Sequence, residues 1–406
     1  MKICQINCIY GIGSTGKLTR DLHLSLLDNG FQSIVISPNS NQFTTDKGVF
    51  TLVPRWVSLC SAVLKRGLGM QYDWAYYQTH KIIGILKREK PDVVHLQCIN
   101  GNNINVYQLY HYLAKNKIKT LLTLHAEFPY TGGCGHAYEC NRWKIGCGKC
   151  PIRKEATQSV IFDLTARTWK KLSSSYRDFR PENFHITAVS PWLLSRAEES
   201  PLLHGFKKNV VLNSVDVEIF KYYPFAKNEW NKKLGIKDEK ILLYVTAGFY
   251  PHLQDLKGGR FIVDLAERLK DKNIRVVIAA NYGDPGTLPS NIVYLGRVGS
   301  QNELAQLYSS VDLSVITSRR ETFSMPVAES LCCGTPIVGF KAGGPESIAI
   351  KQYSEFVEYG DLNALYECIV RWMNSSHDKF TISEQSILLY SKSSMAQEFI
   401  KQYLSL

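Results

Sequence analysis

Two glutamates, Glu321 and Glu329, are separated by seven residues in a short polar break between two apolar runs. The run before them, 312–317, is rich in β-branched residues and has the composition of a buried parallel strand. The run 326–333 has the pattern of a helix with proline in its first turn. The sequence therefore places Glu321 in a strand-to-helix turn and Glu329 within the first two turns of the helix.

The turn itself would present backbone amides at the N-terminus of this helix, namely those of Thr322, Phe323 and Ser324. A helix N-terminus attracts anions, and a carboxylate beside it can accept hydrogen bonds from the hydroxyls of a ligand whose phosphate the amides hold. The pattern therefore predicts a sugar-phosphate site. A solvated, glutamate-rich helix cap is the alternative for this stretch taken alone.

A lysine in the loop 248–259 offers a positive charge to the same kind of ligand. The loop follows a predicted strand at 240–246, and Lys257 and Gly258 stand near its end, just before a helix. A lysine at a helix start is well placed to meet a phosphate. An ordinary helix entry is the alternative for a lone Lys-Gly pair.

A glycine-rich turn, Gly11-Ile-Gly-Ser-Thr-Gly-Lys17, follows the first predicted strand at 2–8. Dinucleotide-binding folds share its G-x-G-x-x-G spacing, but the second strand, 33–37, is followed by no acidic residue for a ribose. Leu18 stands where a P-loop needs a hydroxyl for Mg²⁺. What remains is a helix N-terminus that a ligand can approach closely.

Two histidines accompany further strands. His125 follows the strand predicted at 119–124, whereas His95 lies inside the strand at 92–97. Strands and helices alternate throughout, which predicts open parallel sheets covered on both faces, with ligands beyond the carboxyl ends of the strands. We therefore expect His125 to line the site and His95 to be a satisfied interior histidine.

Four cysteines are concentrated in a short segment: Cys134, Cys140, Cys147 and Cys150. The last two have the spacing with which two thiolates bind one metal ion, so the cluster predicts a structural zinc site in a chain predicted to be cytoplasmic. Two disulfides or free thiols stay open as alternatives. Nothing in the pattern marks a catalytic metal.

The length of 406 residues exceeds the size at which one core keeps growing, and the strand pattern restarts near residue 205. We expect an N-terminal domain at 1–205 with a cysteine-rich insertion at 134–150, a C-terminal domain at 206–385, and a helix at 386–406 that could pack back on the first domain. The first residues do not form a signal peptide, and no apolar run is long enough to span a bilayer, which predicts a cytoplasmic protein.

Positive charge is concentrated in the first half of the chain. Residues 1–200 contain 25 Lys and Arg against 14 Asp and Glu, whereas residues 201–406 contain 23 against 22. A basic face suits an anionic membrane surface or a phosphorylated acceptor, and the sequence has none of the zinc-finger, RNP or basic-zipper patterns of nucleic-acid binding. Segment 55–66 is apolar with basic ends, which suits a peripheral membrane contact; a core-facing helix is the alternative.

Taken together, these motifs resemble the retaining glycosyltransferases of family 4. The resemblance spans nearly the whole chain and rests on a set of glycine, proline and acidic motifs. They are Gly11 to Gly16, Ser190-Pro-Trp192, Asn213-x-Val-Asp216-x3-Phe220, Lys257-Gly258, Glu321-x7-Glu329, Gly334-Thr-Pro336 and Gly343-Gly-x-Glu346. The cysteine region is similar to that of colanic-acid and O-antigen transferases. The resemblance implies the α/β GT-B fold, with two Rossmann-like domains facing a central cleft.

The resemblance also implies a role for each matched residue. Donor nucleotide sugar would be bound mainly by the second domain and the acceptor by the first. Glu329 would bind ribose hydroxyls, Glu321 would contact the donor sugar near the reacting centre, and Lys257 would neutralise the diphosphate. His125 would lie near the sugar, and the glycine turn with Gly13 would abut the phosphates.

One departure from the family pattern concerns positive charge. The family often has an arginine after a glycine shortly before the lysine, but here Phe249 follows the glycine. A second cation for the diphosphate is therefore unassigned, and the candidates are Arg319, Arg320 and Lys17.

The predicted function is retaining transfer of one sugar from a nucleotide-diphosphate donor to a lipid-diphosphate-linked oligosaccharide. We expect it at the inner face of the cytoplasmic membrane, in bacterial surface-polysaccharide assembly such as O-antigen or exopolysaccharide synthesis. Because the sequence has no Asp-x-Asp motif, we expect amides and lysine to neutralise the diphosphate without a cofactor. Two other functions stay open: a Mg²⁺-dependent P-loop phosphotransferase, which Leu18 disfavours, and a non-catalytic, zinc-stabilised binder of sugar nucleotides or polysaccharide.

Overall fold

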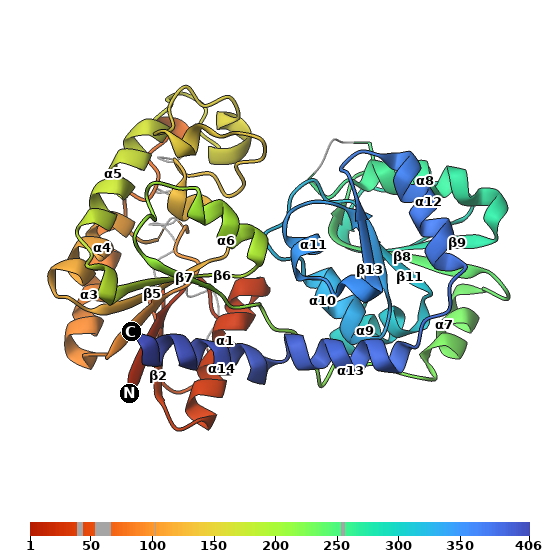
Figure 1. The fold of residues 1–406 in the computed structure, drawn as a ribbon, viewed down its shortest axis with the longest axis horizontal. Coiled ribbons are helices and arrows are strands. Elements are labelled where there is room, and N and C mark those ends of the chain that lie inside the picture. Colours follow the sequence, from red (N-terminus) through yellow and green to blue (C-terminus); the bar gives the residue numbers. More distant parts are fainter. Residues whose placement is uncertain (39–43, 53–65, 102, 253–255) are drawn as a thin grey trace. The chain divides into compact units, whose positions relative to one another are not determined.

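The computed structural model describes residues 1–38, 44–52, 66–101, 103–252 and 256–406. Within it the chain divides into two compact units. Unit 1 comprises residues 1–212 and 395–406, and unit 2 comprises residues 213–394. Each unit is built on its own parallel sheet, as the alternation of strands and helices predicts (Figure 1).

Seven parallel strands form the sheet of unit 1, in the order β3-β2-β1-β4-β5-β6-β7. The inner strands are short apolar runs whose residues are almost all buried, because helices cover both faces of the sheet. The strands are β1 (Lys2–Ile6), β2 (Gln32–Ser37), β3 (Val49–Thr51), β4 (Val93–Leu96), β5 (Lys119–Leu124), β6 (Phe184–Ala188) and β7 (Lys207–Val210). Gln5 pairs with His95, and His95 pairs with Leu121, so the carboxyl ends of β1, β4 and β5 lie on one edge.

Helices cover the two faces of this sheet in the way right-handed crossovers require. α1 and α14 lie on one face, and α3, α4 and α5 lie on the other (Figure 1). The helices are α1 (Gly13–Asp28), α3 (Tyr76–Glu89), α4 (Val106–Lys115), α5 (Thr165–Arg177), α6 (Pro191–Glu198) and α14 (Lys392–Ser405). Shorter helical turns are η1 (Phe128–Tyr130), η2 (Arg142–Lys144), η3 (Arg153–Thr157) and η4 (Pro181–Asn183).

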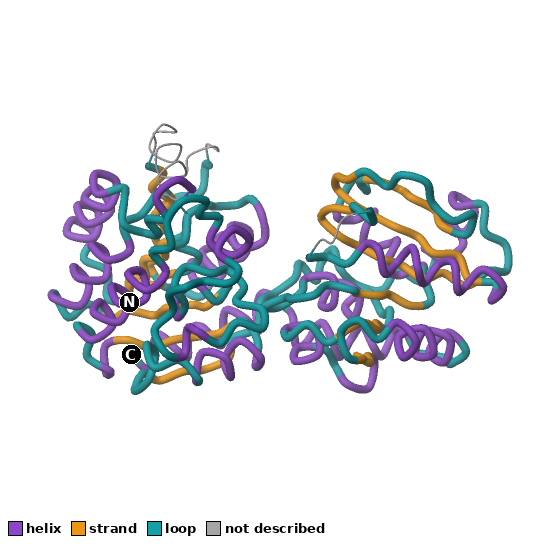
Figure 2. The backbone as a smooth tube through the Cα atoms, turned by 90° about the horizontal axis from the view of Figure 1, so that it is seen from above, coloured by secondary structure: helices purple, strands orange, loops and turns teal. Residues whose placement is uncertain are grey.

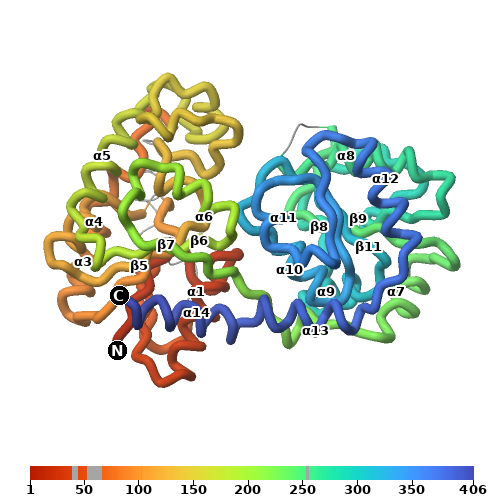
Figure 3. Tube along the Cα trace, in the orientation of Figure 1, coloured from red at the N-terminus to blue at the C-terminus, as the bar shows by residue number. Residues whose placement is uncertain are grey.

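Residues from both ends of the described chain share one core in unit 1. Apolar side chains of α1 and of strands β1, β4 and β5 pack against Met395, Phe399 and Tyr403 of α14. Figure 3 shows the blue C-terminal helix running beside the red N-terminal segment. The chain therefore leaves unit 1, builds all of unit 2, and returns to complete the first core.

Six parallel strands form the sheet of unit 2, in the order β10-β9-β8-β11-β12-β13. They are β8 (Lys240–Phe249), β9 (Ile274–Gly283), β10 (Ile292–Gly296), β11 (Leu313–Ile316), β12 (Ile337–Phe340) and β13 (Ser354–Val357). The helices are α7 (Ala226–Leu234), α8 (Gly259–Leu269), α9 (Gln301–Ser310), α10 (Met325–Cys332), α11 (Gly344–Ile348), α12 (Leu362–Met373) and α13 (Lys379–Tyr390), with turns η5 (Lys270–Lys272) and η6 (Lys351–Tyr353). In each unit the strands run between helices (Figure 2).

The core of unit 2 lies between its sheet and the pair α8 and α12. Leu242, Val276 and Val315 of the sheet are fully or almost fully buried there against Ile262 and Leu265 of α8. The opposite face of the sheet carries α9, α10 and α13 (Figure 1). The turns that follow the carboxyl ends of β8 and β11 carry polar residues.

Two expectations from the sequence change at the level of the fold, and a third falls outside the described residues. The boundary between the units falls at 212/213 rather than 205/206, because β7 pairs with β6 and so extends the first sheet. The single helix expected at 386–406 is two helices, α13 and α14, with Ser391 between them. The apolar stretch 55–66 lies outside the described residues except for Arg66, and no helix among those described is long and apolar enough to cross a membrane.

Candidate functional site

Lys257 and Glu321 form an ion pair in unit 2. The Lys257 Nζ and Glu321 Oε1 atoms lie 2.5 Å apart, and the Ser318 hydroxyl donates to the same Oε1 at 2.9 Å. The Lys257 side chain is 34% exposed and that of Glu321 is 16% exposed. The structure thus brings two of the predicted residues together where solvent, and therefore a ligand, can reach them.

Backbone contacts fix Lys257 at the carboxyl end of β11. The hydroxyls of Tyr244 and Thr317 both donate to the carbonyl oxygen of Lys257, at 2.8 and 3.0 Å. Gly258 has a φ of 73°, and a Cβ at this position would lie 2.3 Å from the carbonyl oxygen of Thr317. A side chain there would clash with backbone, so the close approach of the loop to the strand requires the glycine that follows Lys257.

Glu321 is held through its own backbone. Its N–H donates to the carbonyl of Ala342 at 3.0 Å, and its carbonyl accepts from the N–H of Gly344 at 2.8 Å. The Glu346 carboxylate accepts from the N–H groups of Ala342 and Gly343, at 2.8 to 3.0 Å. The Gly343-Gly-x-Glu346 motif therefore has a physical role, because it supports the turn that carries Glu321.

The start of α10 lies within one residue of the expectation. The helix begins at Met325, one residue before the predicted start at Pro326, and Ser324 is its N-cap with a φ of 91°, an uncommon conformation for serine. Thr322 and Phe323 lie in the turn before the cap, which is where the sequence placed them. That their amides bind a phosphate stays a prediction.

Glu329 lies on α10, as expected, and its Oε2 accepts a hydrogen bond from the hydroxyl of Tyr308 at 3.3 Å. Burial and the nearby Glu329 carboxylate raise the pKa of Tyr308 well above its usual value, so the phenol stays protonated and donates. The carboxylate is only partly buried. The Tyr308 hydroxyl therefore orients the carboxylate of Glu329.

Phe249 occupies the position where the family often has an arginine, and the structure places it in the core of unit 2. The side chain is fully buried at the end of β8, against the rings of Tyr244 and Tyr294 at centroid distances of 6.2 and 5.9 Å. Gly283 of β9 approaches its backbone closely. A cation at this position would lose its hydration, so the second positive charge must come from elsewhere.

The glycine turn in unit 1 leads directly into α1. Gly13 is the first residue of that helix, with a φ of 62°, and the N–H of Gly11 donates to the carbonyl of Gly16 at 2.9 Å. Lys17 is exposed on the same helix. The predicted strand, turn and helix are all observed at this point.

His125 lies immediately after β5, as predicted. Its Nε2 atom is 2.8 Å from Oε1 of Gln97, and burial lowers the pKa of His125 to about 4. His95 lies inside β4 with each ring nitrogen 2.7 Å from a hydroxyl, that of Tyr403 and that of Thr123. The expectation that His95 is a satisfied interior histidine is therefore confirmed.

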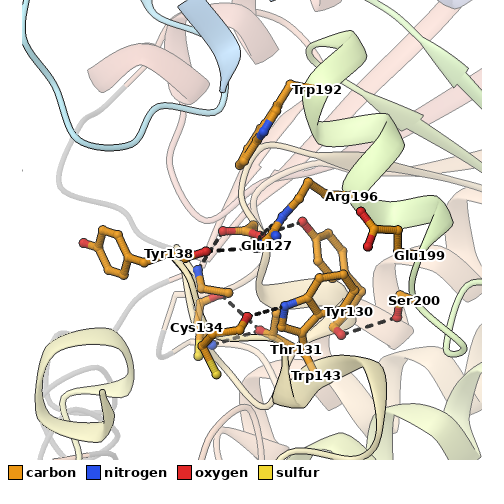
Figure 4. A network of polar contacts seen from close by, with 12 residues as sticks. Glu127, Tyr130, Thr131, Cys134, Tyr138, Trp143, Trp192, Arg196, Glu199 and Ser200 are labelled. Carbon is orange, nitrogen blue, oxygen red and sulfur yellow. Dashed lines mark hydrogen bonds and ion pairs between the residues drawn. The ribbon is translucent and has the colours of Figure 1, made fainter. Parts of the chain in front are cut away.

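A buried carboxylate organises the segment after His125 (Figure 4). Glu127 is fully buried, and its Oε1 accepts hydrogen bonds from the Arg196 guanidinium, at 2.8 and 3.0 Å, and from the Tyr130 hydroxyl at 3.0 Å. Arg196 in turn lies over the rings of Trp143 and Trp192, 4.9 and 5.6 Å from their centroids. The charge of Glu127 is thereby compensated within unit 1.

The four cysteines of the predicted zinc site all line one pocket, together with Trp143 and Thr165. All four are free thiols, and hydrogen bonding between Cys134 and Cys150 lowers the pKa of Cys150 to about 7. Across the described residues, however, no group of three or more His, Cys, Asp or Glu side chains is arranged to hold a metal ion. The structure gathers the thiols without showing a zinc site or a disulfide among them.

A family match lies within the second unit. Residues 239–375 match the family model of glycosyl transferases group 1. A D-inositol 3-phosphate glycosyltransferase from Thermobifida fusca is 24% identical over 254 residues, which cover 54% of this chain and 57% of that protein. An N,N'-diacetylbacillosaminyl-diphospho-undecaprenol alpha-1,3-N-acetylgalactosaminyltransferase from Campylobacter jejuni is 24% identical over 213 residues, covering 49% and 55%. The chain thus spans about half the length of the curated relatives it matches.

Solved structures extend the similarity to the whole chain. Sucrose-phosphate synthase from Thermosynechococcus elongatus has a TM-score of 0.67 at 14% identity, covering 99% of this chain and 98% of that one. Alr3699/HepE from Anabaena, in complex with UDP, has a TM-score of 0.65 at 14% identity and full coverage of both chains. The chain therefore has the GT-B fold, and the family match at residues 239–375 lies within its second unit.

Several residues with polar contacts in the two units are not apparent from the sequence. Gln97 follows β4 in the structure, but the strand predicted at 92–97 includes it, so its position at a strand end is not apparent from the residue types. Ser318 lies in the stretch from which Glu321 was chosen, yet a serine before a turn carries no signal of its own. Arg196 and Tyr403 gave no signal, because their partners are distant in the sequence.

Proposed function

We propose that the protein is a retaining glycosyltransferase that moves a sugar from a nucleotide-diphosphate donor to an acceptor hydroxyl. The Lys257–Glu321 pair carries this proposal, because it places a cation and a carboxylate 2.5 Å apart at the carboxyl end of a strand in a group 1 glycosyltransferase domain. These two charges match a sugar diphosphate donor. Its leaving group is anionic, and its sugar becomes cationic as the bond between them breaks. The nucleotide part is supported by the complexes of Alr3699/HepE with UDP and with UDP-glucose.

Each partner of the pair has a separate task in this reaction. Lys257 would exchange its contact with Glu321 for the diphosphate and stabilise the negative charge that develops on the leaving group. Glu321 would then be released toward the sugar, where a carboxylate stabilises the oxocarbenium-like transition state. Glu329, oriented by Tyr308, would bind the ribose hydroxyls. The resemblance implies retention with assistance from the donor phosphate, so no dedicated base is assigned.

Metal and cofactor requirements follow from the same residues. GT-B transferases of group 1 generally work without a metal ion. The sequence lacks the Asp-x-Asp motif that would bridge a metal to the diphosphate, which agrees with neutralisation by lysine and backbone amides. A structural zinc at the cysteine cluster remains a prediction from spacing alone. Zinc content near zero in the purified protein, with all four thiols titratable, would reject it.

For the acceptor we propose a lipid-diphosphate-linked oligosaccharide of bacterial surface-polysaccharide synthesis, used at the inner face of the cytoplasmic membrane. Two similar proteins support this choice: the diphospho-undecaprenol transferase of Campylobacter jejuni and WaaG, a glycosyltransferase involved in lipopolysaccharide biosynthesis. WaaG has a TM-score of 0.59 at 12% identity. The excess of positive charge in the first half of the chain also favours an anionic surface.

An exposed apolar patch in unit 1 supports peripheral membrane binding. Val160, Ile161 and Phe162 are consecutive and 51 to 60% exposed. Val160 donates its N–H to the carbonyl of Arg66, and the Arg153 guanidinium donates to the carbonyls of Val160 and Ile161. Apolar side chains bordered by arginines match the interface of an anionic bilayer, with its acyl chains and phosphate groups.

The experiment that tests the reaction is release of nucleoside diphosphate from a panel of nucleotide sugars, with and without acceptor. The acceptors should include undecaprenyl-diphosphate saccharides. They should also include D-inositol 3-phosphate, because several similar proteins are D-inositol 3-phosphate glycosyltransferases. Acceptor-dependent release supports transfer. ATP hydrolysis that requires Mg²⁺ would instead indicate a phosphotransferase, and donor binding without release or transfer would indicate a binding protein.

Membrane binding is tested separately by sedimentation with vesicles containing anionic lipid. We expect Ile161→Asp to weaken binding and added salt to weaken it further. Leu388→Asp, at a residue of unit 2 that is 77% exposed, is the matched control and should bind like the wild type. Equal binding of both variants, or none by the wild type, would reject the membrane proposal.

A further inference from the structure

A hollow in unit 1 is lined by the segment 149–155 and by Asp163. Its volume is about 430 Å³, which falls within the range of roughly 300 to 1,000 Å³ that is typical of small-ligand sites. Figure 1 shows this part of the chain in yellow, next to α5. The hollow is therefore large enough to receive a polar group of a ligand.

Hydrogen bonds tie the two walls of this hollow together. The Arg153 guanidinium donates from Nη1 to the carbonyl of Ile161 and from Nη2 to the carbonyl of Val160, each at 2.9 Å. The carboxylate of Asp163 accepts from the N–H of Cys150 at 2.6 Å. Because both ends of the second wall are held by the first, the hollow is formed before a ligand binds, and binding requires little further ordering.

The charges around the hollow favour an anion. Three basic side chains and two carboxylates line it, namely Lys149, Arg153, Lys154, Glu155 and Asp163. The Asp163 carboxylate also accepts from the N–H and the hydroxyl of Thr165, at 3.0 and 2.6 Å, so donors of the protein compensate its charge. The three cations outweigh the remaining carboxylate, and the hollow carries a positive potential.

The geometry of these donors suits a phosphate better than a carboxylate. The side chains of Lys149 and Lys154 are exposed, and an ammonium binds phosphate as a point charge. Arg153 uses two of its five N–H groups for the carbonyls of the opposite wall, and its guanidinium also lines the hollow. A tetrahedral phosphate presents oxygens in several directions and can meet donors on different sides, whereas a carboxylate presents two oxygens in one plane.

Apolar side chains stand next to these charges. Val160, Ile161 and Phe162 directly precede Asp163 and are 51 to 60% exposed. A soluble anion would contact the charged groups and leave these three side chains in water. A phospholipid offers both a phosphate and an apolar part, so it matches the hollow and the neighbouring side chains together.

We propose that this hollow binds the phosphate group of an anionic phospholipid while residues 160–162 enter the apolar boundary of the same membrane. The inference rests on the membrane contact of the proposed function and adds the chemical group that the contact recognises. All of its residues belong to unit 1, and sugar transfer plays no part in it.

Sedimentation with two kinds of vesicle tests whether phosphate is recognised. Both consist mainly of a neutral galactolipid without phosphate. One kind also contains phosphatidylglycerol, and the other contains the same mole fraction of a diacylglycerol hemisuccinate, whose single charge is a carboxylate. Since the surface charge is equal, non-specific attraction is equal. We expect the wild type to bind the phosphatidylglycerol vesicles about tenfold more tightly, through its charged hydrogen bonds to phosphate.

A double variant and a matched control assign this preference to the hollow. Lys149→Gln combined with Lys154→Gln should weaken binding to phosphatidylglycerol vesicles about 30-fold, as expected for two basic residues near an anionic surface, and should remove the preference. Lys115→Gln combined with Lys119→Gln makes the same change of charge at two exposed lysines near the start of β5 and should keep the preference. An equal preference in both double variants would overturn the proposal.

The remaining outcomes separate this site from the proposed function. Equal binding of the wild type to both kinds of vesicle would refute the phosphate site and leave the membrane contact standing, whereas binding to neither would refute both. Calorimetric titration with glycerol phosphate covers a soluble ligand: binding that requires the two lysines, without any binding to vesicles, would overturn the lipid assignment. Release of nucleoside diphosphate is measured without vesicles, so a failure of transfer is not confused with a failure of this site.

Discussion

The two units position their polar residues by different means. In unit 2 the key groups are charged, and backbone hydrogen bonds fix them, as with the carbonyl of Lys257 and the amide of Glu321. In unit 1 the key groups are neutral, and buried side chains such as Gln97 orient His125. Charges suit a leaving group whose charge changes during the reaction, whereas a neutral network suits the recognition of hydroxyls that stay uncharged.

The burial of Phe249 in the core agrees with this contrast. In unit 2 the charged residues lie in turns that are held by backbone hydrogen bonds. The end of β8 belongs to the core instead, and Phe249 is buried there. In unit 1, the side-chain amides of Gln5 and Gln97 form a hydrogen-bonded chain from the carbonyl of Thr19 to His125. Both amides of this amide chain are buried, so the chain would tolerate no net charge without a partner. Each of the following predictions tests one side of the comparison.

Phe249→Arg has the largest expected effect. Removing a fully buried phenylalanine and burying a charge in its place should lower the free energy of unfolding by about 3 to 5 kcal/mol or more. Phe380→Arg, at a residue of α13 that is 59% exposed, is the matched control and should be nearly neutral. Denaturant unfolding measures both. A stable Phe249→Arg protein with faster transfer would show that position 249 belongs to the site.

Lys257→Ala and Glu321→Ala should each slow transfer by at least ~10²-fold, as expected for loss of one electrostatic contact to the transition state. Stability should change little, because the pair is partly exposed. The exposed pair Lys341 and Glu358 of the same unit supplies matched control variants, which should transfer sugar at the wild-type rate. Near-wild-type transfer by both site variants would refute the site.

Acid should destabilise unit 1 before unit 2. Burial lowers the pKa of His125 to about 4 and that of His95 well below its usual value. The unfolded chain therefore binds more protons between pH 4 and 6.5, and stability falls as pH falls through this range. For His125 alone the loss at pH 5 is about 2 kcal/mol.

Hydrogen exchange measured peptide by peptide at pH 7 and pH 5 resolves the two units. Amides of β4 and β5 should lose protection, once the intrinsic pH dependence of exchange is removed, before those of β8 and β11. His125→Gln should reduce the difference. Equal losses of protection in both sheets would contradict the contrast between a neutral interior in unit 1 and a charged surface site in unit 2.

The features of unit 2 that could be predicted from the sequence are those in which neighbouring residues act together. Lys257 with Gly258, and Glu321 in its turn, are local patterns whose strand-to-helix setting follows from composition. The start of α10 was predicted to within one residue, but the uncommon backbone of Ser324 has no signature in the residue types. The core position of Phe249 depends on packing against β9, which sequence order does not show.

The amide chain of unit 1 could not be predicted, because it depends on strand order. Gln5 and Gln97 meet because β1 pairs with β4, although 92 positions separate them in the sequence. Tyr403 reaches His95 across 308 positions. The cysteine spacing correctly indicated that the four thiols converge, yet spacing does not set the directions of the thiols, and the geometry of a zinc site is not observed.

The return of α14 to unit 1 sets an order of events during protein synthesis. Residues 395–406 are synthesised after all of unit 2. Until then the core of the first unit lacks Met395, Phe399 and Tyr403. Domains usually fold in the order in which they are translated. In this protein the second unit can fold first, and the first unit, with its amide chain to His125, is completed last.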